Sequence, residues 1–238
     1  MKEWQDIGIV LSARKYGEQK LILEVFTPEH GRHKGLLNQG KSSRSSSVWQ
    51  TGNLVEVSWR ARLEEHLGNY TCEIIKPYCV AVFDNPLLLA SISSLCAELS
   101  AFLPERDLFP NLFLHTKSLL DNLESPTWLS EYCHWELELL AELGFSLDFT
   151  KCALTGETEN LAFVSPKTGR AVTAAAAAPW KEKLLPLPYF LATGEETASV
   201  DDILSALKLT GYFLSRQTSC GELPAARFRL QEKLSSLF

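Results

Sequence analysis

Short apolar runs separated by turn residues dominate the first third of the chain. Aliphatic and β-branched residues gather at 7–11 and 21–27, residues 32–37 form a third strand-like segment after the turn at 28–31, and two more runs follow at 54–59 and about 69–82. The run at 54–59 alternates apolar and polar residues, which is typical of a half-buried strand. Five short strands at regular spacing predict an antiparallel sheet or barrel.

Beyond this region, apolar residues recur at three- and four-residue steps, as they do along helices that are buried on one side. The predicted helices cover residues 87–103, 110–123, 126–143, 200–215 and 223 to the C-terminus. Residues 150–176 interrupt this rhythm with turn residues around a short β-like piece. The pattern predicts an α+β, two-domain protein: a barrel over residues 1–82, and a mostly helical domain over 83–238 with a small knuckle-like insertion at about 150–176.

Charge is distributed unevenly along the chain. The net charge is −6, yet residues 14–44 contain seven Lys or Arg against three Glu. A basic island in an acidic chain indicates where an anionic partner binds, and small barrels of the oligonucleotide-binding (OB) type bind single-stranded nucleic acid in this way. The basic residues predicted to contact DNA are Arg14, Lys15, Lys20, Arg32, Lys34, Lys41, Arg44, Arg60 and Arg62.

Aromatic side chains in the same region are candidates for stacking on bases. They are Tyr16, Trp49, Trp59 and Tyr70. Core packing is the favoured interpretation for Trp59. Residues 38–47 are serine-rich and basic and have almost no apolar side chains, which predicts an exposed, mobile loop.

Residues 35–42 also fit the G-x-x-x-x-G-K-S pattern of a phosphate-binding loop. That interpretation requires a helix beginning at Lys41, and the serines that follow Lys41 make a poor helix. A nucleotide hydrolase is therefore an alternative that the pattern disfavours.

The sequence contains no recognisable motif for metal binding or for nucleophilic catalysis. The five histidines and six cysteines form no C-x-x-C or H-E-x-x-H motif, and no G-x-S-x-G is present. We expect no catalytic residue, no cofactor and no metal. The N-terminus lacks the apolar segment of a secretory signal, and no apolar run approaches the roughly 20 residues of a membrane span. These observations predict a cytoplasmic protein, and the DNA binding expected of the basic island would make it nucleoid-associated.

Three segments together resemble the bacterial recombination mediators of the RecO family. Residues 4–11 are similar to the family's first strand, and residues 23–32 are similar to its second strand and turn. The most specific segment is WELELLAELG at 135–144, which leads into Cys152.

The resemblance implies an N-terminal OB-fold barrel, a helical body and, in some members, a four-cysteine zinc knuckle. Here Thr155 stands where a second cysteine is expected, and residues 165–169 contain no cysteine. A single thiolate cannot form a tetrahedral structural zinc site. We therefore expect a degenerate knuckle without metal, in which Cys152 is a small buried residue.

The resemblance also implies function. Such proteins bind single- and double-stranded DNA, anneal complementary strands, bind the acidic tail of single-stranded DNA-binding protein (SSB), pair with RecR and help to load the RecA recombinase. No catalysis is required for these tasks. Lys117 and His134 are the residues predicted to contact the SSB tail. A non-catalytic adaptor that docks acidic partner tails without binding DNA is the alternative function.

Overall fold

The computed structural model describes residues 1–38, 49–218 and 221–236, in two compact units. The first unit consists of Met1–Leu123 and Pro224–Lys233, and the second contains Glu124–Leu223 and the residues after Lys233. These units divide the chain by compactness, whereas the predicted domains divide it by type of secondary structure. The predicted boundary between residues 82 and 83 therefore stays a prediction.

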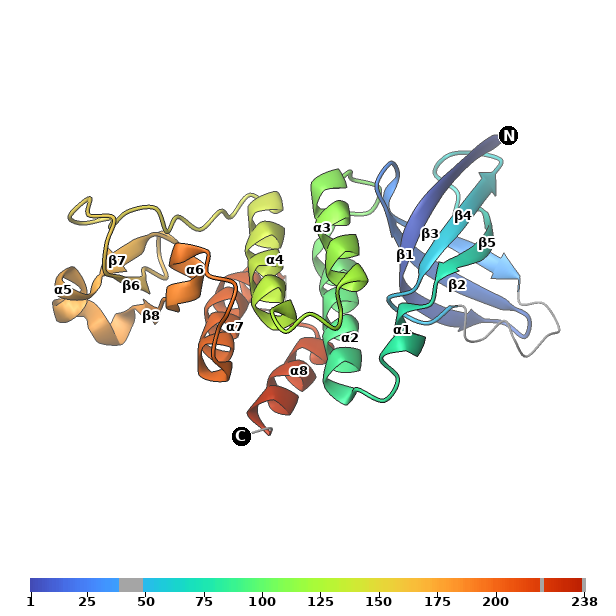
Figure 1. The fold of residues 1–238 in the computed structure, drawn as a ribbon. Helices are drawn as coiled ribbons and strands as arrows, with labels where there is room; N and C mark the ends of the chain where they lie inside the picture. Colours follow the sequence, from blue (N-terminus) through green and yellow to red (C-terminus); the bar gives the residue numbers. More distant parts are fainter. Residues whose placement is uncertain (39–48, 219–220, 237–238) are drawn as a thin grey trace. The chain divides into compact units, whose positions relative to one another are not determined.

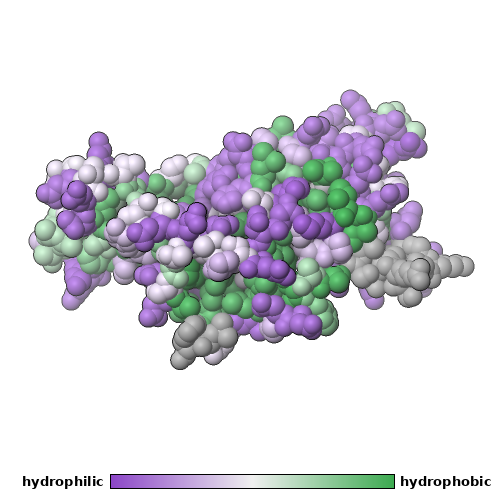
Figure 2. All heavy atoms as spheres, viewed as in Figure 1, coloured by the Kyte–Doolittle hydropathy of each residue, from purple (hydrophilic) through white to green (hydrophobic). Residues whose placement is uncertain are grey.

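Five strands in the first unit form a closed barrel in the order β1-β2-β3-β5-β4 (Figure 1). They are β1 (Lys2–Tyr16), β2 (Lys20–Thr27), β3 (Gly31–Asn38), β4 (Leu54–Ala61) and β5 (Asn69–Lys76). This confirms the predicted five-stranded barrel, and its order is that of a Greek key. Figure 2 shows both hydrophilic and hydrophobic residues over the visible face of this unit.

The first strand is much longer than the apolar run at 7–11. Its first half pairs with β4, from Lys2 opposite Ala61 to Ile9 opposite Leu54. Its second half pairs with β2 as far as Tyr16 opposite Lys20, with a register shift between Val10 and Ser12. The apolar run marks the buried middle of the strand, and the polar ends are held by backbone pairing.

Strands β3 and β5 close the barrel through a short parallel contact, in which Leu36 and Leu37 lie opposite Asn69 and Tyr70. The interior is filled by side chains that alternate along the strands. The buried core comprises Val10, Leu21, Leu23, Val25, Leu37, Val55, Val57, Trp59, Ala61 and Tyr70. The burial of Trp59 confirms the core-packing interpretation of this residue.

The prediction of a single strand over 69–82 is wrong beyond Lys76. Pro77 follows the strand, and Tyr78–Ala81 form the short helix α1. Proline has no backbone N–H to donate, so pairing with a neighbouring strand ends there.

Two long helices follow the barrel in the first unit, α2 (Pro86–Phe102) and α3 (Pro110–Asp121). The carboxamide of Asn85 caps α2 by accepting a hydrogen bond from the Leu88 N–H at 3.1 Å. Helix α8 (Ala225–Ser235) returns near the C-terminus, and its residues up to Lys233 belong to the same unit.

The second unit is built around α4 (Trp128–Glu142) and α7 (Val200–Ser215), which pack against each other. Ser199 and Asp202 form a capping box at the start of α7. No helix in the described part of the chain is long and apolar enough to cross a membrane.

Between α4 and α7 lies a small module that we call the knuckle module. Its three strands pair in the order β7-β6-β8. Its elements are β6 (Leu161–Val164), β7 (Ala171–Thr173), α5 (Ala174–Ala177), the 3₁₀ helix η2 (Ala178–Lys183), β8 (Leu185–Pro186) and α6 (Tyr189–Thr193). The module extends further along the chain than the predicted 150–176, because β8 pairs back onto β6.

Candidate nucleic-acid interface

Three of the predicted DNA contacts lie at the end of the β1–β2 hairpin. Arg14 and Lys15 are among the last residues of β1, and Lys20 is the first residue of β2. All three side chains are exposed. Gly17, in the turn between these strands, has φ = +67°, a conformation that glycine adopts without the strain of a side chain.

Strand register determines which of these side chains share a face. Arg14 pairs with Ile22, and Tyr16 pairs with Lys20. Directly opposed residues point to the same side of a sheet, and alternate residues along a strand share a face. Arg14, Tyr16 and Lys20 therefore project from the outer face of the hairpin.

The same face continues onto β3, where Lys20 lies opposite Asn38. Asn38 is the last described residue before 39–48. The predicted contacts Lys41 and Arg44, the predicted loop and the start of the helix that a phosphate-binding loop would require lie outside the described residues. Gly35, the first glycine of that pattern, lies within β3.

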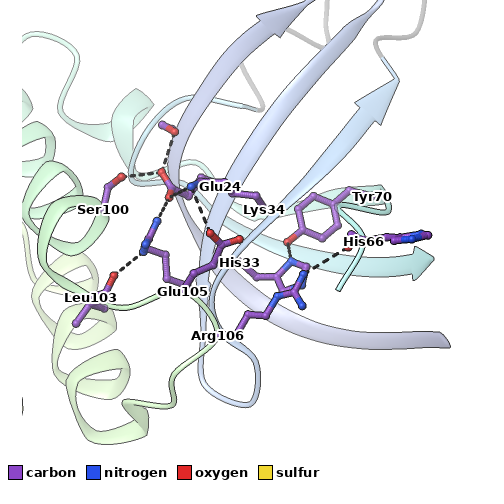
Figure 3. A network of polar contacts seen from close by, with 11 residues as sticks. Glu24, His33, Lys34, His66, Tyr70, Ser100, Leu103, Glu105 and Arg106 are labelled. Carbon is purple, nitrogen blue, oxygen red and sulfur yellow. Dashed lines mark hydrogen bonds and ion pairs between the residues drawn. The ribbon is translucent and has the colours of Figure 1, made fainter. Parts of the chain in front are cut away.

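Arg32 and Lys34 lie further along this outer face, around the buried carboxylate of Glu24. Figure 3 shows Lys34 and Ser100 beside Glu24. Glu24 accepts hydrogen bonds from Arg32 and, at 2.6 Å, from the Ser100 hydroxyl. The Lys34 ammonium lies 3.6 Å from Glu24 and also 3.6 Å from Glu105. Arg32 in addition donates to the Leu103 carbonyl at 2.7 Å.

This network sets the charge of Glu24. Burial alone would raise its pKa, but the hydrogen bonds from Ser100 and Arg32 and the charges of Arg32 and Lys34 outweigh burial and lower it. Glu24 is thus a carboxylate that neutralises Arg32, whose side chain is 13% exposed. The geometry assigns Arg32 to an internal ion pair, and leaves Lys34 more accessible.

Arg60 and Arg62 lie at the opposite end of β1 from the hairpin, since Arg60 pairs with Glu3. The Arg60 guanidinium also forms an exposed ion pair with Glu3 at 2.9 Å. Arg62 follows β4 and is exposed. The described basic residues therefore lie in three places. One group is at the hairpin, another is at the opposite end of β1, and Arg32 and Lys34 lie between them in ion pairs with Glu24.

Of the four candidate aromatic side chains, Tyr16 is the most exposed, at 55%. The indole N–H of Trp59 donates to the Leu67 carbonyl at 2.9 Å, and the Tyr70 hydroxyl lies 2.8 Å from His33 Nδ1. Trp49 packs against the barrel core. Tyr16 is therefore the best-placed of them for stacking on a base.

A hollow of about 410 Å³, which no sequence pattern indicated, lies beside the barrel. Trp4 and His30 stack in its wall with ring centroids 4.0 Å apart, and Arg106 also lines it. Arg106 is held at the hollow because its guanidinium donates hydrogen bonds to the backbone carbonyls of Glu64 and His66. Three glutamates, Glu3, Glu29 and Glu64, share the lining, and their charges oppose phosphate binding.

The two residues predicted to contact the SSB tail lie in different units. The Lys117 ammonium in α3 is 2.6 Å from the Asp121 carboxylate, which also accepts from Lys76 and Tyr78 at 2.7 Å. The His134 ring in α4 makes an edge contact with Phe190, with centroids 5.6 Å apart. Lys117 would have to exchange an existing ion pair to bind another carboxylate.

In the knuckle module, Cys152 is buried and lies close to Thr173, whose N–H donates to its sulfur at 3.4 Å. Burial would raise the pKa of the Cys152 thiol, but hydrogen bonds from Thr155, Thr173 and Leu154 lower it to about 6. Within the described residues, no group of three or more His, Cys, Asp or Glu side chains is arranged to hold a metal ion.

Comparison with known proteins agrees with this architecture. A family model described as "Recombination protein O N terminal" matches residues 1–78, and one described as "Recombination protein O C terminal" matches residues 84–224. The chain belongs to the RecO family. Recombination and DNA repair are thus the processes with which it is associated.

Individual relatives match over almost the whole chain. A protein named "DNA repair protein RecO" from Cereibacter sphaeroides is 44% identical over 239 residues, which cover 99% of both chains. Proteins of the same name from Jannaschia sp. and Rhodospirillum centenum are also 44% identical, over 98% and 97% of this chain and 96% and 94% of theirs. These matches confirm the resemblance inferred from the three sequence segments.

Proposed function

We propose that this RecO-family chain is a non-catalytic recombination mediator that binds single- and double-stranded DNA and anneals complementary strands. The observation that carries the proposal is the exposed group Arg14, Lys15 and Lys20 at the end of the β1–β2 hairpin, with Tyr16 between them. Cations neutralise phosphates and release counterions, and an aromatic ring stacks on bases. Both requirements of single-strand binding are met on one hairpin.

Annealing follows from the same chemistry. Two complementary strands repel each other through their phosphates, and a protein that neutralises both strands lowers that barrier. No nucleotide hydrolysis is needed, since base pairing supplies the free energy. In this proposal Lys34 extends the hairpin surface, Arg60 and Arg62 form a second contact at the other end of the barrel, and Lys41 and Arg44 are further DNA contacts. Arg32 contributes indirectly by holding β3 against Glu24.

The proposed partners are SSB, RecR and, indirectly, RecA. Lys117 and His134 are the proposed contacts for the acidic SSB tail, because a cation and a protonatable ring suit carboxylates. RecR binding and RecA loading rest on membership of the RecO family. The corresponding surfaces on this chain stay predictions.

The deciding experiment compares a hairpin variant, Arg14→Ala/Lys15→Ala/Lys20→Ala, with the unaltered protein. Fluorescence anisotropy with labelled oligothymidine and with a duplex is measured over a salt series, without nucleotide. We expect affinity for both to fall, and the slope of log affinity against log salt for the single strand to shrink by about two, at about 0.7 per lost phosphate contact. Strand annealing should slow in parallel.

A matched control removes the same charge elsewhere through Lys151→Ala/Lys208→Ala/Arg229→Ala, all exposed residues. It should bind DNA nearly as well as the unaltered protein. If both triple variants lose DNA affinity equally, DNA binding depends on the total positive charge of the protein and not on the hairpin. Absence of DNA binding by the unaltered protein, together with binding of an SSB-tail peptide, would favour the adaptor alternative.

A further inference from the structure

The hollow of about 410 Å³ beside the barrel, which we call the Arg106 hollow, has an aromatic stack in its wall. The Trp4 ring stacks on Trp59 with centroids 5.8 Å apart and on His30 with centroids 4.0 Å apart. Trp59 is buried, whereas the His30 side chain is 27% exposed. The stack thus has a buried end at Trp59 and an open end at His30, where a planar ring can continue it.

The orientation of the His30 ring is fixed by the carboxylate of Asp6. This carboxylate lies 3.2 Å from His30 Nδ1, and it also accepts a hydrogen bond from the Glu29 N–H at 3.1 Å. The planes of the His30 and Trp4 rings differ by 12°. The stacking platform is therefore formed before any ligand binds, which lowers the entropic cost of binding.

The Arg106 guanidinium supplies hydrogen-bond donors to the same hollow. Two of its N–H groups donate to the carbonyls of Glu64 and His66, the second of which is seen in Figure 3, and three of its five donors remain. Among the described residues Arg106 forms no ion pair with a carboxylate. Its φ of +69° is uncommon for a residue with a side chain, and such backbone strain is found mostly at functional sites.

The three carboxylates of the lining differ in their partners. The Glu3 carboxylate pairs with Arg60 at 2.9 Å, and the Glu64 carboxylate lies 3.6 Å from the Lys2 ammonium. Glu29 is exposed and forms no side-chain ion pair with the described residues. Glu29 is therefore the lining carboxylate that can accept hydrogen bonds from a ligand without first breaking an ion pair.

We propose that the Arg106 hollow binds a guanine base. The base stacks on His30, its O6 and N7 accept from Arg106, and its N1–H and N2–H groups donate to the Glu29 carboxylate. Guanine alone among the four DNA bases has two adjacent donors on one edge and two acceptors on another. The phosphate stays outside, because the glutamates of the lining repel it.

The base can belong to a single strand or to a free nucleoside, and only the first case rests on the proposed DNA binding. The Arg106 hollow is lined by the first residues of β1, whereas the hairpin lies at the other end of that strand. It shares no residue with the hairpin surface, so the two proposals can fail separately.

A ligand series tests the hydrogen bonds without altering the protein. Labelled oligothymidines of about 12 nucleotides carry one central guanine, hypoxanthine, 7-deazaguanine or thymine, and anisotropy measures their binding to the full-length protein. The guanine strand should bind about tenfold more tightly than the thymine strand. Hypoxanthine lacks the N2 donor and 7-deazaguanine lacks the N7 acceptor, so each should lose most of this gain.

A second arm uses free guanosine, with thymidine as its control, and measures the quenching of tryptophan fluorescence. Guanosine binding without a preference among the strands assigns the site to a free nucleoside. A preference among the strands assigns it to a base within DNA. Either result supports a guanine site, and the guanosine arm still tests the hollow if the protein binds no oligonucleotide.

Variants of the lining then locate the preference. Glu29→Gln and Arg106→Gln should each bind the guanine and thymine strands equally, to within about twofold. Glu65→Gln is the matched control, since this exposed carboxylate lies next to Glu64 and does not line the hollow. It should retain the full preference. The hairpin triple variant should bind both strands more weakly and keep their ratio.

The proposal is overturned if the unaltered protein distinguishes guanine from thymine neither within the strands nor as nucleosides. It is equally overturned if hypoxanthine binds as tightly as guanine, or if Glu65→Gln abolishes the preference as fully as Glu29→Gln does. Circular dichroism verifies that each variant is folded.

Discussion

The imidazole Nδ1 of His33 lies 2.8 Å from the hydroxyl of Tyr70, and both side chains are buried in the barrel. His33 belongs to β3 and Tyr70 to β5, the two strands whose short parallel contact closes the barrel. Burial lowers the pKa of His33 to about 4, and the nearby positive charges of Arg106 and His30 act in the same direction. The closing contact therefore depends on a neutral imidazole.

Stability should fall as the pH decreases from about 6.5 towards 4. The unfolded chain binds a proton at His33 near its ordinary pKa of 6.5, whereas the folded chain binds it near 4, so acid favours the unfolded state across this interval. The expected loss between pH 7 and pH 5 is about 2 kcal/mol. Urea unfolding at the two pH values measures it.

The matched variant for this prediction is His33→Gln, which keeps an amide beside Tyr70 but has no titrating ring. Its stability should change by less than that of the unaltered protein between pH 7 and pH 5. If both proteins lose the same amount, His33 does not carry the acid sensitivity.

Gly35→Ala should destabilise the barrel by about 1–3 kcal/mol. A methyl group at this position would lie 2.7 Å from carbons of the Tyr70 ring, which is itself fully enclosed. Urea unfolding gives the free energy. A double-mutant cycle with Tyr70→Leu provides the control, because the smaller side chain makes room and the penalty should shrink. An undiminished penalty in the Tyr70→Leu background would contradict the steric explanation.

Arg227→Met should destabilise the protein by about 3–5 kcal/mol. The Arg227 guanidinium lies 3.6 Å from the Glu98 carboxylate, and both side chains are fully buried. Removing the cation leaves a buried carboxylate without its ion pair, and it loosens the segment 224–233 that belongs to the first unit. Thermal and urea unfolding measure the loss. The exposed neighbour Arg229→Met should cost less than about 0.5 kcal/mol, and similar losses in the two variants would disprove the role of the buried pair.

These relationships show where sequence patterns are informative. Short strand-like segments bounded by turn residues located all five barrel strands, and the run at 54–59 also alternates apolar and polar residues as a half-buried strand does. The same signal missed the ends of β1, where exposed residues such as Lys2 and Tyr16 pair with neighbouring strands through the backbone. It also extended β5 past Lys76, because the helix at Tyr78–Ala81 is too short to show a helical period.

The candidate site was less predictable than the fold. A basic residue on a strand occupies the same kind of position in the sequence pattern whether its side chain contacts solvent, a phosphate or a buried carboxylate. Arg32 is paired because Ser100 and Leu103, far away in sequence, meet it and Glu24 on the outer face of the barrel. No local pattern indicates such long-range contacts, and the same holds for the Glu98–Arg227 pair.

Tyr16→Ala should weaken oligothymidine binding roughly tenfold, because each stacked base contributes about 1–3 kcal/mol. Tyr16 is uncharged, so the salt dependence of binding should stay the same, whereas Arg14→Ala should reduce its slope by about 0.7. Tyr16→Phe is the matched control: it keeps the ring and loses the hydroxyl, and should bind like the unaltered protein. Anisotropy titrations over a salt series separate the two effects. If Tyr16→Ala and Tyr16→Phe bind equally well, stacking at the hairpin does not contribute, and the surface acts through charge alone.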